Sequence, residues 1–256
     1  MTPDYLIWGY AALLGACIGS FLNVCVYRWP EGLSVIRPPS RCGECGTQIR
    51  WYDNVPIFGW IFLRGRCRAC GTRVSIQYPL IELTVASLWL AAVLRHGVSW
   101  QALSSAMFFT LLLGIALTDA RTYIIPDEFT WGGLAIGLAL SFAPGGITPQ
   151  QSALGALLGF GLLWMVAELG ERAFKKQAMG GGDIKMMAMV GAFVGMPGVL
   201  LTIFLGALLG TLIFGPISWR TKKLVPFGIF LALGAAIAEP WGAAIVQWYL
   251  REFVGI

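Results

Sequence analysis

The feature that most limits the fold of this chain is a succession of long apolar runs. A helix that crosses a bilayer needs about 20 mainly apolar residues, because the hydrocarbon core is about 30 Å thick. Backbone groups in lipid must form their hydrogen bonds within the protein, so such runs fold as helices. With 57% hydrophobic and 12% charged residues, the composition predicts an all-α polytopic membrane protein.

The apolar runs divide the chain into about eight expected transmembrane helices. Short turns rich in glycine and proline separate several of them, at residues 145–146 and 196–198 among others. The fourth and sixth runs are short for a bilayer, so their bounds are the least sharply defined. The expected spans are residues 5–27, 79–95, 100–118, 129–143, 150–168, 184–196, 198–217 and 225–249.

The distribution of Lys and Arg predicts the orientation. If the N-terminus lies outside, 16 of the 18 basic residues fall in cytoplasmic segments, and only Arg95 and Arg251 do not. Because cytoplasmic loops carry an excess of Lys and Arg, we expect a multi-pass protein with its N-terminus outside. This asymmetry accounts for the net charge of +5, so we expect the lipid bilayer, and no nucleic acid, as a partner. The first apolar run is expected to be retained, because no basic residue precedes it.

One segment, residues 28–78, is too polar for the membrane and is expected to form a small cytoplasmic insert. It contains two Cys-x-x-Cys pairs, Cys42 with Cys45 and Cys67 with Cys70, and a glycine follows each pair. This spacing lets both thiolates of a pair bind one tetrahedral ion, and the glycine permits a tight turn. So small an insert buries little apolar surface, and a structural metal would stabilise it. The pattern predicts a zinc site.

Two disulfides are the alternative interpretation of the same four cysteines. A reducing cytoplasm disfavours that alternative. The remaining cysteines, Cys17 and Cys25, lie inside the first apolar run. We expect them to pack against neighbouring residues rather than to bind metal.

Few residues are candidates for catalysis. The single histidine, His96, falls at the outer end of the second expected helix, far from the other candidate groups. The chain therefore lacks the histidines that a zinc protease or a Ser-His-Asp hydrolase needs at its active site. The sequence also lacks a Walker-type phosphate loop. The remaining candidates are two carboxylates beside apolar spans, Asp119 after Ile-Ala-Leu-Thr and Asp183 after Met-Gly-Gly-Gly. Acids are unfavourable near lipid, which points to a function for both.

The expected topology brings these two acids to one side of the membrane. The third helix runs inward and ends at Asp119, whereas the sixth runs outward and begins at Asp183. Two carboxylates that converge do not both ionise readily, so one keeps a proton. Such a pair can activate water as a base and protonate a carbonyl as an acid, which is the chemistry of aspartic proteases.

Each acid also has a structural interpretation. Asp183 can cap the sixth helix, and Asp119 can be an interfacial carboxylate that pairs with Arg121. Asp127 and Glu128 are expected to be ordinary first-turn acids of the fourth helix. Two other classes of function stay open on the residues alone. One is an ion-coupled or proton-coupled transporter that uses both acids as a relay, and the other is a zinc-bearing assembly scaffold.

Together these motifs resemble the type IV prepilin peptidases, the leader peptidase and N-methyltransferase family of bacterial pilus and type II secretion systems. The similarity covers nearly the whole chain. Gly43 and Ile229 depart from it, because the family often has proline at these positions. The matching motifs are Gly19-Ser-Phe-Leu-Asn-Val24, Trp51-Tyr-Asp-Asn-Val-Pro56, Leu63-Arg-Gly-Arg-Cys67, Tyr78-Pro-Leu-Ile-Glu82, Ile125-Pro-Asp127, Gly180-Gly-Gly-Asp183-Ile-Lys185 and Pro226-Phe-Gly-Ile-Phe230.

The resemblance implies a bifunctional enzyme of the bacterial inner membrane. Asp119 and Asp183 would cut a prepilin or pseudopilin after the glycine of its basic leader, at the cytoplasmic face. The enzyme would then methylate the new N-terminal residue with S-adenosylmethionine, a reaction to which similarity links Glu82. An interfacial carboxylate is the alternative for Glu82. The implied domains are a first transmembrane helix (1–27), a zinc-binding insert linked to methylation (28–78) and a membrane aspartic protease domain (79–256).

Overall fold

The structure is a computed structural model that describes residues 4–176, 179–221 and 226–255. Within these ranges the regular structure is helical, apart from two isolated β-bridges in the insert. The predicted all-α fold is confirmed. Its α-helices are α1 (Asp4–Arg28), α2 (Phe58–Phe62), α3 (Gln77–His96), α4 (Trp100–Thr122), α5 (Asp127–Leu140), α6 (Pro149–Phe174), α7 (Gly181–Thr221) and α8 (Phe227–Tyr249).

Among the described residues, six helices are long and apolar enough to cross a membrane: α1, α3, α4, α6, α7 and α8. The protein is therefore a multi-pass membrane protein. The predicted fourth span corresponds to α5, which has 14 residues and is short for a straight crossing. The predicted sixth and seventh spans both lie in α7. Residue 225, which begins the last predicted span, and the basic residues Lys222 and Lys223 lie outside the described ranges.

The long element α7 reverses direction at Gly195. This residue has φ 67° and ψ −176°, which interrupt the helix. Before the break, Asp183 lies within electrostatic reach of Asp119. Asp119 in turn accepts a hydrogen bond from the first turn of α8, so the start of α7 lies near the start of α8. After the break, Gly210 lies against Phe230, also near the start of α8. The two parts of α7 therefore run in opposite directions, and with α5 they bring the helical segments to the eight that the apolar runs predict.

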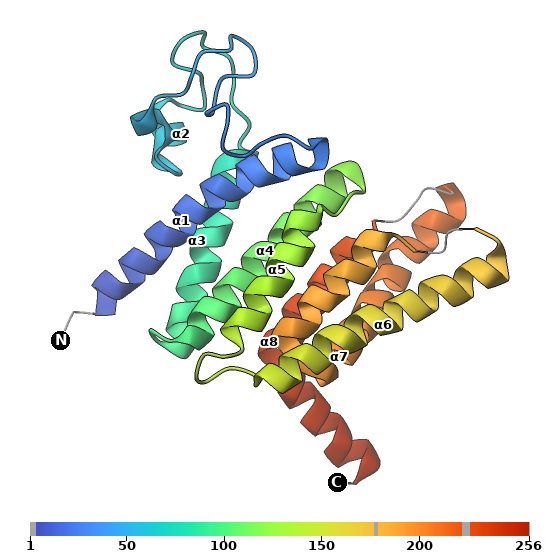
Figure 1. The fold of residues 1–256 in the computed structure, drawn as a ribbon. Coiled ribbons are helices and arrows are strands. Elements are labelled where there is room, and N and C mark those ends of the chain that lie inside the picture. The colour runs from blue at the N-terminus through green and yellow to red at the C-terminus, as the bar shows by residue number, and fades with distance from the viewer. Residues whose placement is uncertain (1–3, 177–178, 222–225, 256) are drawn as a thin grey trace. The chain divides into compact units, whose positions relative to one another are not determined.

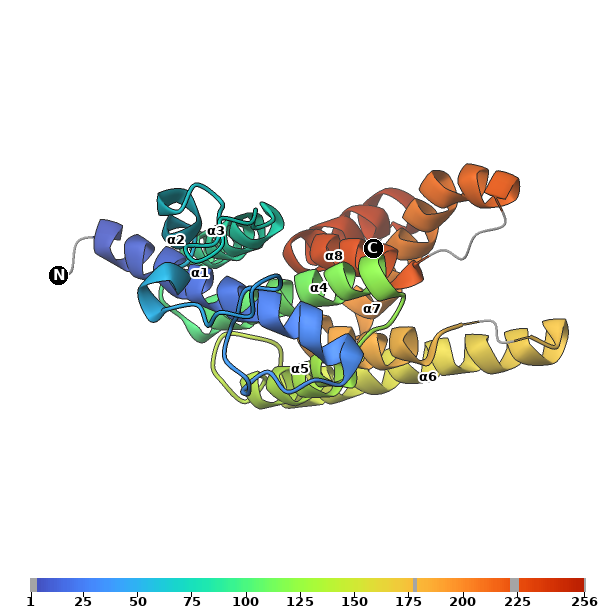
Figure 2. The ribbon, with the colours of Figure 1, turned by 90° about the horizontal axis from the view of Figure 1, so that it is seen from above.

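The first of two compact units, Met1–Ala106, is built on the pair α1 and α3. These helices lie side by side (Figures 1 and 2). A Cβ on Gly15 would lie 2.9 Å from the Cα of Ala86, and one on Gly19 would lie 2.8 Å from the Cα of Glu82. Small residues four positions apart let membrane helices approach this closely. The insert, which contains α2, lies at the end of the pair where α1 finishes and α3 begins (Figure 1).

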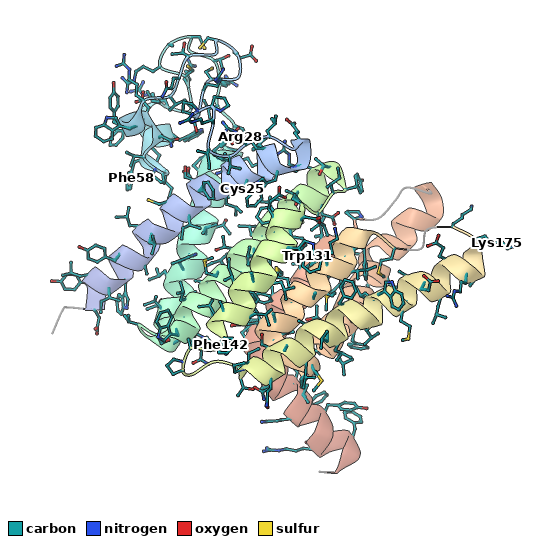
Figure 3. All side chains as sticks on the ribbon, in the orientation of Figure 1. Cys25, Arg28, Phe58, Trp131, Phe142 and Lys175 are labelled. Atoms are coloured by element: carbon teal, nitrogen blue, oxygen red, sulfur yellow. The ribbon has the colours of Figure 1, made fainter. Side chains whose placement is uncertain are left out.

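The second compact unit, Met107–Ile256, is built around α7, which packs against α5, α6 and α8. Gly159 lets α6 lie along the first part of α7 (Figure 2), because a Cβ there would come within 2.1 Å of the carbonyl oxygen of Met187. Figure 3 labels Phe142 at the turn between α5 and α6, and Lys175 at the opposite end of α6. The polar ends of α4, α7 and α8 meet in this unit, and they position the candidate site.

Candidate active site and candidate metal centre

Asp119 lies near the C-terminal end of α4 and has only 5% of its surface exposed. Its Oδ2 atom accepts a hydrogen bond of 3.1 Å from the backbone N–H of Ile229, in the first turn of α8. Gly228 permits this contact, because a Cβ at that position would lie 2.8 Å from Oδ2. The free N–H groups at the start of a helix stabilise negative charge. The start of α8 is therefore a binding site for this carboxylate.

Asp183 lies in the first turn of α7 and is 9% exposed. Its backbone N–H donates a hydrogen bond of 3.2 Å to the carbonyl oxygen of Gly180. A Cβ on Gly182 would lie 2.9 Å from the Cβ of Ile125, so the glycine run passes close to the turn before α5. The carboxyl group of Asp183 lies within electrostatic reach of Asp119. The structure thus brings together the two acids that the sequence singled out.

Asp127 and Lys185 form an ion pair that joins the starts of α5 and α7. The Nζ atom of Lys185 lies 2.7 Å from Oδ1 and 2.9 Å from Oδ2 of Asp127. The side chain of Lys185 is 32% exposed and that of Asp127 is 57% exposed, so water screens the pair. The sequence predicts Asp127 as a first-turn acid of α5, which is confirmed. Its pairing with Lys185 is not predicted.

The four cysteines of the insert form one cluster, with all their sulfur atoms within 4.8 Å of one another. The Sγ atoms of Cys42 and Cys70 lie 3.8 Å apart. Tetrahedral zinc with Zn–S bonds of about 2.3 Å places its sulfur ligands about 3.8 Å apart. The donor set and the sulfur spacing therefore fit a zinc ion.

Each cysteine pair is held in the same tight turn. The N–H of Gly46 donates to the carbonyl oxygen of Cys42 at 3.0 Å, and the N–H of Gly71 donates to that of Cys67 at 2.9 Å. Both glycines have positive φ, 68° and 73°, in the left-handed region that glycine occupies without a steric penalty. The turns predicted from the Cys-x-x-Cys-Gly pattern are thus confirmed.

The thiols of the insert are not joined as disulfides, because all six cysteines of the chain are free. A disulfide requires sulfur atoms about 2.05 Å apart. Hydrogen bonds with Thr47, first its side chain and then its backbone, lower the pKa of Cys45 to about 6. The thiolate is the form that binds metal. Cys17 and Cys25 lie in α1 and take no part in the cluster.

Glu82 lies in the second turn of α3 and is 8% exposed. Its Oε2 atom accepts a hydrogen bond of 2.6 Å from the backbone N–H of Ile57, in the insert. The Ser20 side chain, from α1, also bonds to this carboxylate. Ile57 has φ 65°, which is strained for a β-branched residue. Glu82 therefore connects α1, α3 and a strained turn of the insert.

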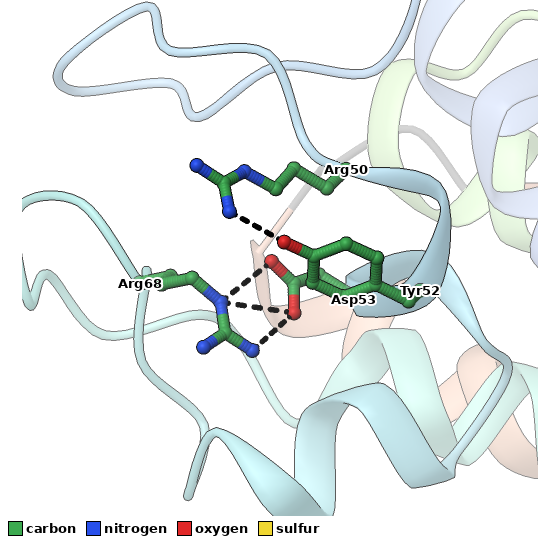
Figure 4. Close-up of polar contacts among 4 residues, drawn as sticks. All are labelled: Arg50, Tyr52, Asp53 and Arg68. Atoms are coloured by element: carbon green, nitrogen blue, oxygen red, sulfur yellow. Dashed lines mark hydrogen bonds and ion pairs between the residues drawn. The ribbon is translucent and has the colours of Figure 1, made fainter.

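A cluster of charged and aromatic side chains fixes the middle of the insert (Figure 4). Arg68 donates hydrogen bonds of 2.6 to 3.1 Å to both carboxylate oxygens of Asp53. The Asp53 side chain is 7% exposed, and its hydrogen bonds with Arg68 lower its pKa. Arg50 donates to the hydroxyl of Tyr52. Because Arg68 lies between Cys67 and Cys70, the ion pair ties the second cysteine turn to the rest of the insert.

Several contacts at these sites are absent from the sequence-based predictions. They are the bond from Ile229 to Asp119, the pair of Lys185 with Asp127 and the bond from Ile57 to Glu82. Ile229 and Asp119 are 110 positions apart, so no local pattern connects them. The available signal was Gly228 at the start of an apolar span, since a glycine there permits close approach of another group.

Two protein-family models match the chain. The Bacterial Peptidase A24 N-terminal domain matches residues 13–96, and the Type IV leader peptidase family matches residues 106–215. The first range falls within the first compact unit, and the second range covers most of the second unit. Asp119 and Asp183 lie in the second match, and the four cysteines and Glu82 lie in the first.

Individual relatives agree with these matches. A prepilin leader peptidase/N-methyltransferase of Myxococcus xanthus is 38% identical over 228 residues, which are 89% of this chain and 64% of that protein. The protein of the same name from Pseudomonas putida is 34% identical over 272 residues, 96% of this chain and 94% of that protein. The one from Neisseria gonorrhoeae is 34% identical over 252 residues, 89% of this chain and 86% of that protein. No solved structure matches the chain.

The fold and these matches define a multi-pass membrane peptidase. The chain belongs to the type IV leader peptidase family, which confirms the resemblance seen in its motifs.

Proposed function

We propose that this protein removes the leader of prepilins or pseudopilins by hydrolysing a peptide bond with Asp119 and Asp183. The observation that carries the proposal is the proximity of these two buried acids, which come from the ends of different helices. The name of the relatives, prepilin leader peptidase/N-methyltransferase, supports the substrate. Cleavage after the glycine of the leader rests on the family resemblance.

In the proposed reaction, one acid is ionised and the other carries a proton. The ionised acid takes a proton from water, whose oxygen attacks the carbonyl carbon of the scissile bond, while the protonated acid donates to the carbonyl oxygen. The acid that took the proton from water then gives it to the leaving amine as the C–N bond breaks. The other acid recovers its proton from a hydroxyl group of the collapsing tetrahedral intermediate. The N–H of Ile229 donates to Asp119, so we assign the base to Asp119 and the acid to Asp183.

The glycines around the two acids are proposed to admit the substrate backbone. Gly180, Gly181 and Gly182 precede Asp183, and a Cβ on Gly181 would meet open space. A backbone without side chains lets an extended peptide approach the carboxyl groups closely. A partly dry site also strengthens the electrostatic interactions that act on the reacting atoms.

The site is proposed to face the cytoplasm from the bacterial inner membrane, with the N-terminus of the chain outside. The bias of Lys and Arg towards one set of loops supports this orientation. Arg172 lies in the last turn of α6, and Lys185 lies near the start of α7, two residues after Asp183. A basic leader would remain in the cytoplasm, whereas the apolar segment after the cut would enter the bilayer.

A second activity, methylation of the new N-terminal amine, is proposed for the region of the insert. S-adenosylmethionine would supply the methyl group when bound. Glu82 is proposed to contribute to this site, and its bonds to Ile57 and Ser20 would orient the adjoining turn of the insert. Cys42, Cys45, Cys67 and Cys70 would hold a structural zinc ion, whose role is to fix the insert.

We propose that successive segments of the chain carry the different functions. Residues 1–27 form the first membrane helix, residues 28–78 form the zinc-binding insert linked to methylation, and residues 79–256 carry the protease. Gly15 and Gly19 let α1 approach α3 closely within the compact unit Met1–Ala106. The helix α3 therefore packs with the first membrane helix, although this division counts it with the protease.

The decisive experiment is cleavage of a synthetic prepilin by the purified protein in detergent with added phospholipid. Mass spectrometry would score the loss of the leader and, with S-adenosylmethionine present, the gain of one CH₂ group. We expect both products. A transporter or an assembly scaffold would give neither, so a well-folded preparation that leaves the prepilin intact contradicts the proposal.

A further inference from the structure

The insert contains an open pocket of about 580 Å³ on the side of its second cysteine turn. Its lining includes Trp60, three arginines and two residues just before α3, which are Ser75 and Ile76. None of these residues is a predicted metal ligand or a candidate catalytic acid. The arginines are Arg64, Arg66 and Arg73.

Backbone contacts give this pocket a fixed frame. The N–H of Gly65 donates to the carbonyl oxygen of Trp60 at 2.8 Å, and the N–H of Val74 donates to that of Gly65 at 2.8 Å. The indole N–H of Trp60 donates to the carbonyl oxygen of Val74 at 3.0 Å. Gly65 has φ 65°, and a Cβ there would lie 2.7 Å from the Trp60 ring. Main-chain hydrogen bonds and the ring of Trp60 therefore hold the segment with Arg64 and Arg66 against the segment with Arg73.

The three arginines of the pocket differ from others in the same insert. Arg68 is paired with Asp53, and Arg50 is bonded to Tyr52. By contrast, within the described part of the chain the guanidinium groups of Arg64, Arg66 and Arg73 make no hydrogen bond or ion pair. Three unneutralised positive charges around one pocket repel one another and attract an anion.

Large apolar side chains are exposed next to this pocket. Ile76 is 58% exposed and is followed directly by α3, a candidate membrane span. The neighbouring helix α2 exposes Phe58, Ile61 and Phe62, at 56%, 54% and 81% (Phe58 is labelled in Figure 3). Exposed aromatic and aliphatic residues beside basic residues, at the start of a membrane helix, are typical of the lipid–water interface.

We propose that the pocket formed by Trp60, Arg64, Arg66 and Arg73 binds the phosphate of an anionic phospholipid at the membrane surface. The planar guanidinium groups match the oxygen atoms of a phosphodiester and can each donate two hydrogen bonds to it. The apolar residues of α2 and Ile76 would contact the upper part of the acyl chains. S-adenosylmethionine fits the pocket less well, because its sulfonium and ammonium groups would meet three like charges.

Bound lipid would anchor the insert to the bilayer at the start of α3. Juxtamembrane Lys and Arg residues strengthen binding at an anionic membrane surface. The site is distinct from Asp119 and Asp183, which lie in the other compact unit. Its failure would therefore leave the proposed peptidase activity untouched.

The test uses the full-length protein purified in a neutral detergent and titrated with short-chain phosphatidylglycerol, with bound lipid scored by native mass spectrometry. The pocket variant carries Arg64→Gln and Arg73→Gln. The control carries Arg37→Gln and Arg41→Gln, which remove the same charge from exposed arginines of the insert that do not line the pocket. We expect the apparent Kd to rise about tenfold or more in the pocket variant and to change little in the control.

Two further arms identify the ligand. Phosphatidylcholine should bind more weakly than phosphatidylglycerol, and inorganic phosphate should not displace the lipid at equal concentration, because it lacks the apolar part. Equal affinity for lipid in the pocket and control variants would overturn the proposal. Tight binding of inorganic phosphate alone would also overturn it, because the site would then hold a soluble anion. Should the double variant unfold, as judged by its thermal midpoint, Arg64→Gln alone gives the same comparison against Arg37→Gln.

Discussion

The backbone N–H of Ile229 donates a hydrogen bond of 3.1 Å to Oδ2 of Asp119, so the start of α8 meets the end of α4 at one carboxylate. The same acid lies within electrostatic reach of Asp183, at the start of α7. Three helix ends thus converge on two acids. We therefore expect substitutions of the two acids, and substitutions of the backbone glycine that supports Asp119, to impair leader cleavage in different ways.

Asp119→Asn and Asp183→Asn should each reduce leader cleavage by about 10²-fold or more, because an amide can neither take a proton from water nor donate one as an acid. Membrane insertion and the thermal midpoint should stay close to those of the parent protein. The measurement is the rate of leader loss from a synthetic prepilin, scored by mass spectrometry.

Asp127→Asn is the matched control, because it alters a neighbouring acid that is paired with Lys185 and is largely exposed. It should change the cleavage rate only a few-fold, as expected for an exposed pair. Near-parental processing by either dyad variant, or an equal loss in the control, would argue against the assigned roles.

Gly228→Ala should impair cleavage although the residue has no reactive side chain. Its Cβ would lie 2.8 Å from Oδ2 of Asp119, and the displaced carboxylate would no longer align with the bound peptide. Misplacement of a reacting group by about 1 Å can lower a rate about 10²-fold. Gly242→Ala is the control in the same helix, because its Cβ would make an ordinary contact of 3.5 Å with Leu201. Equal rates in both variants would show that Gly228 is not needed for the site.

The sequence predicts local features well because their causes are local. Apolar runs of span length predict helices, and the Cys-x-x-Cys-Gly spacing predicts the turns at Gly46 and Gly71. The approach of Asp119 to Asp183 is also predicted, since the direction of each span follows from the count of helices. Contacts that depend on the packing of distant segments are not predicted. The strained φ of Ile57, supported by Glu82, has no signature in the residues around it.

The metal site makes a compositional prediction, which is one zinc ion per chain bound by Cys42, Cys45, Cys67 and Cys70. Single Cys→Ser changes at these positions should lower the bound zinc and destabilise the insert, because three ligands leave the tetrahedral site incomplete. The measurement is metal analysis of the purified protein together with a thiol count.

Cys17→Ser is the control for the metal site, because this cysteine lies in α1 and outside the cluster. It should leave the bound zinc unchanged. A zinc-free protein that is folded and methylates its substrate would refute the site. Leader cleavage should suffer less than methylation in the ligand variants, because the two acids lie in the other compact unit.

Glu82→Gln should separate the two proposed activities. The amide oxygen can still accept the N–H of Ile57, so the turn that this bond supports should persist. The negative charge is lost, so methylation should fall while leader cleavage continues. Mass spectrometry scores both products of one reaction. An equal loss of both would show that Glu82 supports the fold, and unchanged methylation would remove it from the methyl-transfer site.

The ion pair of Asp53 with Arg68 should stabilise the insert above acidic pH. The bonds from Arg68 lower the pKa of Asp53 in the folded protein, below the value of about 3.9 for an unperturbed Asp. A group with a lowered folded pKa stabilises the fold above its unfolded pKa, and that contribution is lost as the pH falls towards the folded pKa. Arg68 is 52% exposed, so water screens the pair and we expect its contribution to stability to be small.

A double-mutant cycle tests this stabilisation by hydrogen exchange of the insert amides, corrected for intrinsic rates. The variants are Asp53→Asn, Arg68→Gln and the combination of both, compared with the parent protein at pH 7 and at pH 3. At pH 7 each single change should speed exchange of the insert amides. The loss of stability in the double variant should be smaller than the sum of the losses in the two single variants, because the ion pair is lost only once. At pH 3 the difference between the parent and Asp53→Asn should shrink, because this pH lies below the pKa of about 3.9 of Asp53 in the unfolded chain. A pH-independent difference would mean that Asp53 acts through its shape and neutral hydrogen bonds rather than through its charge.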